Sequence, residues 1–202
     1  DITDNPSVTL ANNEALKAYQ LFLLDYNGNP WGLEARANFV AAVRDRGTGV
    51  FVLHAANNPF PGWKEYEEIC GLLWRQGTGH GEFHEFPVTV TQPNHPVMQG
   101  IEDFRTWDEL YHGLVNPRGV KYEVLATGYS SKESRGTGQN EPVMVTLTYG
   151  KARIFHQILG HVWPGDPNGA YKGASMIALD MPAFKTVLVR GCEWAATGQV
   201  TA

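Results

Sequence analysis

Two apolar segments separated by one amphipathic segment constrain the fold of this chain more than any other feature. Residues 20–24 and 50–53 are almost entirely apolar, as in strands that are buried on both faces. Between them, residues 33–46 carry apolar side chains at helical spacing and end at Gly47, a residue typical of helix C-termini. A buried strand, a helix and a second buried strand in this order predict a βαβ unit with parallel strands, and therefore an α/β fold.

The rest of the chain adds predicted helices and strands but no second domain. We expect helices at residues 14–19, 63–74 and 181–197, and strands at residues 86–91, 122–126, 143–148 and 153–159. Apolar and polar side chains alternate in residues 86–91, which is typical of an edge or antiparallel strand. We therefore predict a mainly parallel, flavodoxin-like three-layer sandwich with an added antiparallel strand or hairpin. Since no linker or internal repeat divides the chain, residues 1–202 are expected to form a single domain.

Composition narrows the range of partners. The net charge is -5 and Lys and Arg form no cluster, so we expect no nucleic-acid partner. The aromatic-rich, acidic composition suits a neutral, sugar-like small molecule better than a phosphate-rich one.

No apolar run approaches the ~18 residues of a membrane span, and no signal peptide is visible. Because a cleaved signal would leave no trace, a cytoplasmic and an exported location both stay open. Cys70 and Cys192 lie among apolar residues in helical patterns and are predicted to be buried free thiols.

Two histidines stand where predicted strands end. His54 directly follows the strand at residues 50–53, and His161 follows Gly160 after the strand at residues 153–159. The loops beyond the carboxyl ends of parallel strands form the binding crevice of an α/β sheet, so we expect both imidazoles to reach one crevice. Each ring could serve as a base, an acid or a metal ligand. The structural alternative is a histidine that bonds the backbone at the end of a strand.

His54 occupies a position that carries the nucleophile in many hydrolases and amidotransferases. In those enzymes a Ser or Cys sits at the sharp turn between a strand and a helix. The small residues Ala55 and Ala56 would allow such a turn here. Because the residue itself is neither Ser nor Cys, the sequence argues against an acyl-enzyme mechanism.

The segment Asp108-Glu109-Leu110-Tyr111 supplies two carboxylates and a phenol. In an extended chain, Asp108 and Glu109 face opposite ways, so only one of them is expected to point into a given pocket. A glycosidase-like pair of carboxylates is therefore not predicted from these residues. A single carboxylate, Glu109 in our interpretation, could orient an imidazole or bind sugar hydroxyls, and the alternative is a solvated strand face.

The remaining histidines give weaker signals. His80 and His84 are four residues apart, a spacing that binds metal on a helix, but the flanking glycines argue against a helix. Loop hydrogen bonding or substrate contact is the preferred interpretation, and no cofactor is predicted, with a divalent metal as the lesser alternative. His95, in an Asn-His-Pro turn, and His156, inside a predicted strand, are expected to be structural.

These segments together resemble the ThuA-like (trehalose utilisation) family, whose fold is akin to that of class I glutamine amidotransferases. The matching residues run in the family's order over nearly the whole chain: 49–56, Trp63 and Tyr66, 79–81, 94–100, 108–111, 124–127, 141–143, 149–156 and 159–161. Each motif is weak alone, but their ordered combination is specific. The resemblance predicts a single ThuA-like domain with an amidotransferase-like sheet.

Three departures limit what this resemblance implies. The first convincing strand begins only near residue 20, so either a first βα unit is missing or the sheet is smaller than usual. Ala152 stands where a glycine is common in the family. His54 occupies the position of the amidotransferase cysteine, so glutamine hydrolysis is not carried over.

The resemblance implies sugar metabolism, on oxidised (3-keto) glycosides or disaccharides made by a partner sugar dehydrogenase. A keto group acidifies the neighbouring C–H, so a histidine base with an acid partner could cleave the glycosidic bond by elimination. In this interpretation His54 and His161 act as base or acid, and Glu109 orients a ring or binds a hydroxyl. The candidate substrate contacts are Asn27, Trp63, His80, Asp108 and Tyr111. Trp31, Trp63 and Trp163 could stack on a sugar ring or pack in the core.

Two other classes of function stay open at this stage. A non-catalytic carbohydrate-binding or assembly domain would use the same scaffold without its nucleophile. A metal-dependent hydrolase is the third alternative, and a homo-oligomer is compatible with each of the three. Fold resemblance alone does not decide among them.

Overall fold

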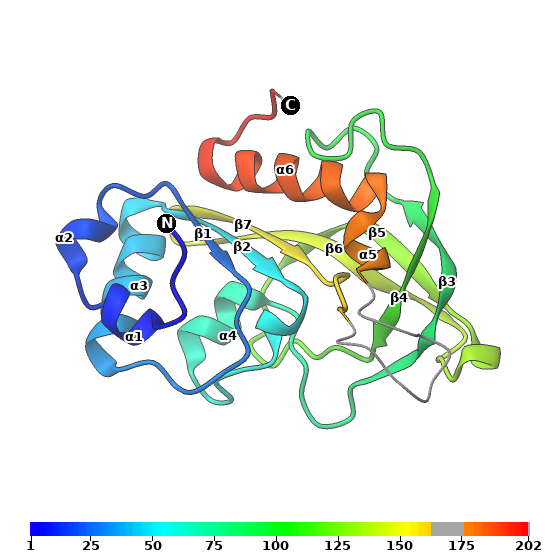
Figure 1. Ribbon diagram of the computed structural model, residues 1–202, viewed down its shortest axis with the longest axis horizontal. Helices are drawn as coiled ribbons and strands as arrows, with labels where there is room; N and C mark the ends of the chain where they lie inside the picture. The colour runs from blue at the N-terminus through cyan, green and yellow to red at the C-terminus, as the bar shows by residue number, and fades with distance from the viewer. Residues whose placement is uncertain (163–175, 202) are drawn as a thin grey trace.

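The computed structural model describes residues 1–162 and 176–201 of the chain. These residues form a seven-stranded sheet in the order β1-β2-β7-β6-β5-β3-β4, with helices packed on it (Figure 1). The strands are β1 Leu21–Leu24, β2 Gly49–Leu53, β3 Gly79–Val90, β4 Phe104–His112, β5 Tyr122–Ser130, β6 Gln139–Tyr149 and β7 Ala152–Gln157. The helices are α1 Pro6–Thr9, α2 Asn13–Leu16, α3 Leu33–Ala41, α4 Lys64–Cys70, α5 Ile177–Asp180 and α6 Pro182–Thr197. Shorter helical segments are η1 Ala42–Arg46, η2 His54–Asn57 and η3 Lys132–Ser134.

The sheet has a parallel end and an antiparallel end. β1, β2 and β7 run parallel to one another, with Leu53 of β2 beside Gln157 of β7. From β7 through β6, β5 and β3 to β4, each strand is antiparallel to its neighbour. The predicted α/β class and the βαβ unit are confirmed, while the antiparallel part is larger than the single strand or hairpin that we expected.

Helices cover both faces of the parallel end. Alternate residues of a strand point to opposite faces of the sheet. Val52 accordingly packs in one hydrophobic core with Phe39 of α3 and Ile69 of α4, whereas Phe51 packs in a second core with Phe184 of α6. Figure 1 shows α6 on one side of the sheet and α3 and α4 on the other. Burial on both faces explains why the residues of β2 are apolar without alternation.

The sheet curls, which brings its two ends together. Four strands lie between β2 and β4, a separation of about 24 Å in a flat sheet with strands about 4.8 Å apart. Nevertheless, Oη of Tyr111 on β4 lies only 3.0 Å from Nε2 of His54, which directly follows β2. Side chains of the antiparallel end therefore reach the carboxyl ends of the parallel strands.

The predicted helix at residues 63–74 is shorter in the structure. α4 ends at Cys70 because Gly71 adopts a φ of +71°, after which Leu73 pairs with Val115 in a β-bridge. Trp74 therefore lies outside the helix. The glycine- and histidine-rich segment that we expected to be a loop is instead the start of β3, and its register with β4 shifts between His80 and Phe83.

Two smaller expectations concern the thiols and the membrane. Cys70 and Cys192 are both free, as predicted; Cys70 is buried and Cys192 is partly exposed. Within the described part of the chain, no helix has both the length and the apolar character needed to cross a bilayer.

Candidate functional site

Candidate residues from both ends of the sheet meet at one place. His54 follows β2 and His161 lies in the loop beyond β7, and these two strands are parallel neighbours. The curl of the sheet adds side chains from the other end, which we define together with the two histidines as the histidine cluster: His54, His80, Asp108, Glu109, Tyr111 and His161. His80 comes from β3, and the carboxylates and the phenol come from β4.

His54 is held in a strained backbone conformation. Its φ of +44° lies in the left-handed region, which costs about 1–2 kcal/mol for a residue with a Cβ. Gly160 packs against it, with a φ of +139° of its own, and a Cβ built on Gly160 would stand 3.3 Å from the Cβ of His54. Such strain persists only where the surrounding structure holds it, and it is concentrated at functional sites. The turn after β2 is therefore a candidate site on backbone geometry alone.

Hydrogen bonds define the tautomer of His54. Its Nδ1 lies 2.7 Å from the backbone oxygen of Ile158, so Nδ1 carries the proton and donates to that oxygen. Nε2 is then an acceptor, and Oη of Tyr111 donates to it at 3.0 Å. Burial lowers the pKa of His54 to about 4, and the nearby rings of His161 and His80 act in the same direction. His54 is therefore a neutral imidazole at neutral pH.

The carboxylate of Glu109 lies between two other histidines. Oε2 of Glu109 is 3.2 Å from Nδ1 of His161, and Oε1 is 3.5 Å from Nδ1 of His80. The Glu109 side chain is only 7% exposed, whereas those of His161 and His80 are 25% and 43% exposed. Solvent can therefore reach the two imidazoles on either side of a buried carboxylate.

The position of Glu109 also favours one tautomer of His161. A proton on Nδ1 of His161 can be shared between Oε2 of Glu109 and Nε2 of His54, which is 3.2 Å away. This tautomer places the lone pair of His161 on Nε2, which is the arrangement of a base oriented by a carboxylate. Burial lowers the pKa of His161, and the charge of Glu109 acts in the opposite direction.

Asp108 holds the loop that carries His161. Its side chain is fully buried, and it accepts hydrogen bonds from the backbone N–H groups of Gly160 at 2.7 Å and His161 at 3.2 Å. We predicted that adjacent carboxylates face opposite ways, and here Asp108 bonds the loop backbone while Glu109 faces the rings. The sequence predicts that Asp108 is a substrate contact. Its position beneath the loop instead assigns it to loop positioning.

Trp74 belongs to the site, although no sequence pattern points to it. Its ring centre lies 4.6 Å from that of Tyr111 and 6.0 Å from that of His80. The side chain is half-buried and follows the β-bridge at Leu73. Because the spacing of apolar residues in 63–74 predicts a helix, the pattern assigns Trp74 to that helix rather than to a site. The break at Gly71 was the available signal that the helix ends earlier.

Two candidate substrate contacts lie outside the histidine cluster. Asn27 and Trp63 line a separate pocket of about 540 Å³, and no member of the histidine cluster is among the residues that line it. Trp63 is mostly buried and packs against Trp31, which itself lies in the core. Of the three tryptophans considered for sugar stacking, Trp163 lies outside the described residues.

Other histidines have structural surroundings. His156 is buried, and its Nδ1 lies 3.0 Å from the backbone oxygen of Cys70, which matches the core role expected for it. His95 packs edge-on against Trp194. In the part of the chain that the structure describes, no three His, Cys, Asp or Glu side chains are arranged to hold a metal ion.

The buried titratable groups predict opposing effects of pH on stability. Burial lowers the pKa of His54 and His156 to about 4 from an ordinary 6.5. The stability that these two neutral rings contribute to the folded protein is therefore present above pH 6.5 and is lost as the pH falls to about 4. Burial raises the pKa of Asp108 from 3.8 to about 7, although the backbone N–H groups that donate to it act in the opposite direction. The stability that the protonated Asp108 carboxyl contributes to the folded protein is therefore present at low pH and is lost as the pH rises through about 7.

We therefore expect the Asp108→Asn variant to lose stability more steeply than the wild type as the pH falls from 7 to 4. The free energy of unfolding from urea titrations at each pH measures this difference, with the exposed Asp25→Asn as the control. An equal slope in Asp108→Asn and wild type would mean that the Asp108 carboxyl stays ionised across this range.

Comparison with known proteins gives a match to one family over nearly the whole chain. The family model described as ThuA, trehalose utilisation, matches residues 1–195. No curated protein matches the chain.

Solved structures share the fold. A ThuA-like protein from Parabacteroides merdae is 36% identical with a TM-score of 0.80, over 93% of this chain and 74% of that one. A ThuA-like protein from Bacteroides uniformis is 18% identical with a TM-score of 0.70, over 99% and 79% of the two chains. A cytoplasmic protein from Salmonella typhimurium is 13% identical with a TM-score of 0.59, over 94% and 79%. The last two comparisons show similarity of fold alone.

Proposed function

The chain belongs to the ThuA (trehalose utilisation) family, and from this membership we propose that it cleaves keto-glycosides by acid–base chemistry at the histidine cluster. The observation that carries the proposal is the buried carboxylate of Glu109 between the partly exposed rings of His161 and His80. A carboxylate in this position orients an imidazole and stabilises the imidazolium that forms when the ring takes a proton. A sugar dehydrogenase would supply the substrate by oxidising a hydroxyl of a glycoside to the ketone.

The proposed step is an elimination. In a 3-keto glycoside the hydrogen on C2 is acidic, because the adjacent carbonyl stabilises the charge that its removal creates. Nε2 of His161 takes this proton, the electron pair forms a double bond between C1 and C2, and the bond from C1 to the glycosidic oxygen breaks. His80 donates a proton to the departing oxygen. The products are an unsaturated keto sugar and a free alcohol or second sugar, with no net oxidation or reduction.

His54 takes a positioning role in this proposal. The sequence predicts a base or acid at this position, but His54 is only 7% exposed and its lowered pKa keeps it neutral. Its Nε2 instead accepts from Oη of Tyr111 and lies 3.2 Å from Nδ1 of His161. Both contacts hold neighbouring groups in place around the base.

The test uses the wild-type protein with a 3-keto-disaccharide and the unoxidised disaccharide. We expect release of the free alcohol or sugar, with an ultraviolet absorbance that grows as the conjugated ketone accumulates, from the keto substrate only. In deuterated water, exchange at C2 measures proton removal separately from bond cleavage. A keto-disaccharide that is neither cleaved nor exchanged would contradict the proposal.

Replacement of Glu109 by glutamine should lower kcat by about 10²–10⁴-fold with little change in KM, because the amide no longer stabilises the imidazolium of His161. Steady-state kinetics on the keto-disaccharide measure the effect. Glu82→Gln is the matched control, since Glu82 lies on β3 and pairs with Arg135. Equal kcat values for Glu109→Gln and the wild type would remove the carboxylate from the mechanism.

The burial of His54 and Tyr111 favours a second candidate, a carbohydrate-binding or assembly domain without turnover. In that case the cluster would bind the sugar through hydrogen bonds alone. Calorimetric binding of the keto-disaccharide, without cleavage and without exchange at C2, would select this candidate over the first.

A further inference from the structure

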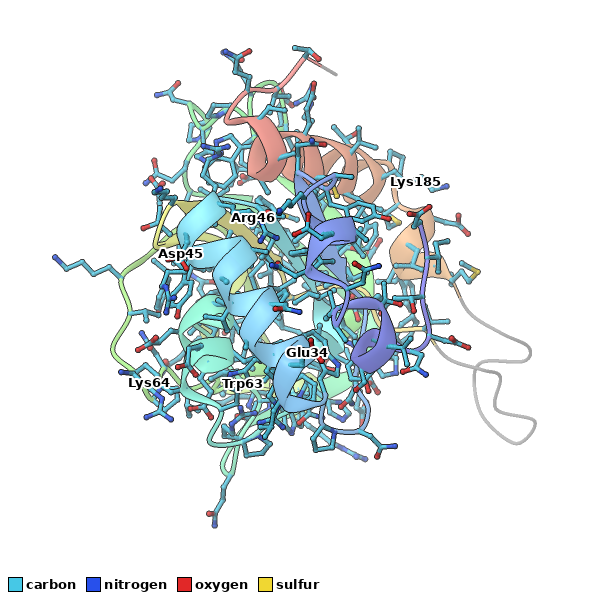
Figure 2. All side chains as sticks on the ribbon, turned by 90° about the vertical axis from the view of Figure 1, so that its left-hand side faces the viewer. Glu34, Asp45, Arg46, Trp63, Lys64 and Lys185 are labelled. Atoms are coloured by element: carbon cyan, nitrogen blue, oxygen red, sulfur yellow. The ribbon has the colours of Figure 1, made fainter. Side chains whose placement is uncertain are left out.

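The pocket that contains Asn27 and Trp63 lies beyond the carboxyl ends of β1 and β2. Its volume of about 540 Å³ is in the range of small-molecule sites. Its walls come from the connection after β1, from Arg36 of α3 and from residues 58–63 after β2. Figure 2 shows Trp63 beneath α3, close to Lys64 at the start of α4. Crevices beyond the ends of parallel strands are the usual ligand sites of α/β sheets.

Arg36 is the one charged residue among the described residues that line this pocket. The carbon of its guanidinium lies 4.8 Å from the centre of the Trp63 ring, and its Nε donates to the backbone oxygen of Trp31 at 2.9 Å. These two contacts fix the guanidinium plane and leave Nη1 and Nη2 to bind another group. In the described part of the chain, the ion pairs include no carboxylate on Arg36. A fixed guanidinium with two such N–H groups matches a carboxylate or phosphate.

The wall formed by residues 58–63 contains a second strained residue. Phe60 has a φ of +60° and stands between Pro59 and Pro61. A bulky residue with this φ is a genuine outlier, and it persists only where its surroundings fix it. Phe60 and Trp63 are only 5% and 8% exposed, so they shape the wall, with Trp63 against Arg36, rather than offer a face to a sugar.

A buried ion pair fixes the segment that carries Phe60. Nη1 of Arg75 donates to the backbone oxygen of Asn58 at 2.7 Å, while its Nη2 lies 3.1 Å from Oε1 of Glu67. The same Glu67 oxygen accepts from the backbone N–H of Gly62 at 3.0 Å. Both ends of the segment are thus held by one Arg–Glu pair. A preformed wall of this kind reduces the entropy cost of binding.

We propose that this pocket binds an anionic, monosaccharide-sized sugar derivative, with Arg36 on its carboxylate or phosphate and the amides of Asn27 and Asn58 on its hydroxyl groups. The guanidinium selects the oxyanion, and the amides and the pocket volume select the sugar. This site shares no residue with the histidine cluster, so it does not depend on turnover there.

Isothermal titration calorimetry of the wild-type protein tests the proposal with glucuronate, glucose 6-phosphate, inorganic phosphate and glucose. We expect one or both anionic sugars to bind at least tenfold more tightly than glucose and than inorganic phosphate. Preference for glucuronate or for glucose 6-phosphate identifies the anion as a carboxylate or a phosphate. Glucose that binds as well as the anionic sugars, or inorganic phosphate that does so, would overturn the proposal.

Variants of Arg36 test whether the anionic sugar binds in this pocket. Arg36→Gln, whose amide can still donate to the backbone oxygen of Trp31, should weaken binding of the preferred anionic sugar at least tenfold. Arg36→Lys keeps the charge but loses the paired N–H groups, so it should show a smaller loss, and it serves as the folded variant if Arg36→Gln is unstable. Arg46→Gln is the control, because Arg46 bonds Asn13 on the surface. Wild-type affinity in both Arg36 variants would contradict the assignment.

Discussion

Replacement of His161 by alanine is expected to lower turnover of a 3-keto-disaccharide by about 10²–10⁴-fold, the usual range for loss of a general base. The lone pair on Nε2 and the carboxylate behind Nδ1 make His161 the best oriented base in the cluster. The protein should stay folded, because the ring is partly exposed and Asp108 holds this loop through the backbone N–H of residues 160 and 161. Steady-state kinetics and a thermal melt measure the two effects.

The pH profile separates a catalytic role of His161 from a structural one. Burial lowers the pKa of His161 below its ordinary value, so on the acid side wild-type kcat/KM should decline when the pH falls below that lowered pKa and the base becomes protonated. Residual activity in His161→Ala should lack this acid limb. His84→Ala is the control, since His84 lies on β3 and bonds the backbone of Glu82 outside the cluster. An acid limb that persists in His161→Ala would assign the base to another group.

The part of the fold that follows from local pattern could be predicted from the sequence. β1, α3 and β2 were expected within one residue or a few of their observed bounds, because strands buried on both faces and a helix ending at a glycine leave clear periodic signals. The extent of the antiparallel end could not be predicted. β3 contains glycines and histidines in its first half, and its register shift with β4 breaks the alternation that identifies a strand.

The candidate site, like the fold, could be predicted from the sequence only in part. The sequence predicts that His54 and His161 converge, because both follow parallel strands whose carboxyl ends share one edge. In the structure, Nε2 of His54 lies 3.2 Å from Nδ1 of His161. The contribution of β4 depends on the curl of the sheet, a property that spreads over many residues and leaves no motif. The different roles of Asp108 and Glu109 could not be predicted either. The sequence indicates that these two side chains point to opposite faces of the strand, but not that Asp108 lies beneath the loop at Gly160.

Replacement of His54 is the second experiment with a large expected effect, and two variants are needed to interpret it. His54→Ala and His54→Gly both remove the ring and with it the acceptor for Tyr111 and the contact with His161. We expect turnover to fall by at least about 10²-fold in both variants, since small misplacements of catalytic groups have effects of this size. Both should also lose stability, because Oη of Tyr111 and the backbone oxygen of Ile158 lose a buried partner, at about 1–3 kcal/mol per group.

The two variants differ in what they do to the backbone. Alanine keeps the cost of the +44° φ, whereas glycine removes it, and the greater freedom of glycine in the unfolded chain offsets part of that gain. His54→Gly should therefore be more stable than His54→Ala by up to about 1 kcal/mol in urea titrations. A glycine variant that is less stable than the alanine variant would show that residue 54 is not strained, because only the greater freedom of the unfolded glycine chain would then separate the two. Wild-type turnover in the glycine variant would show that the fold needs the turn after β2 but that the chemistry does not need the ring.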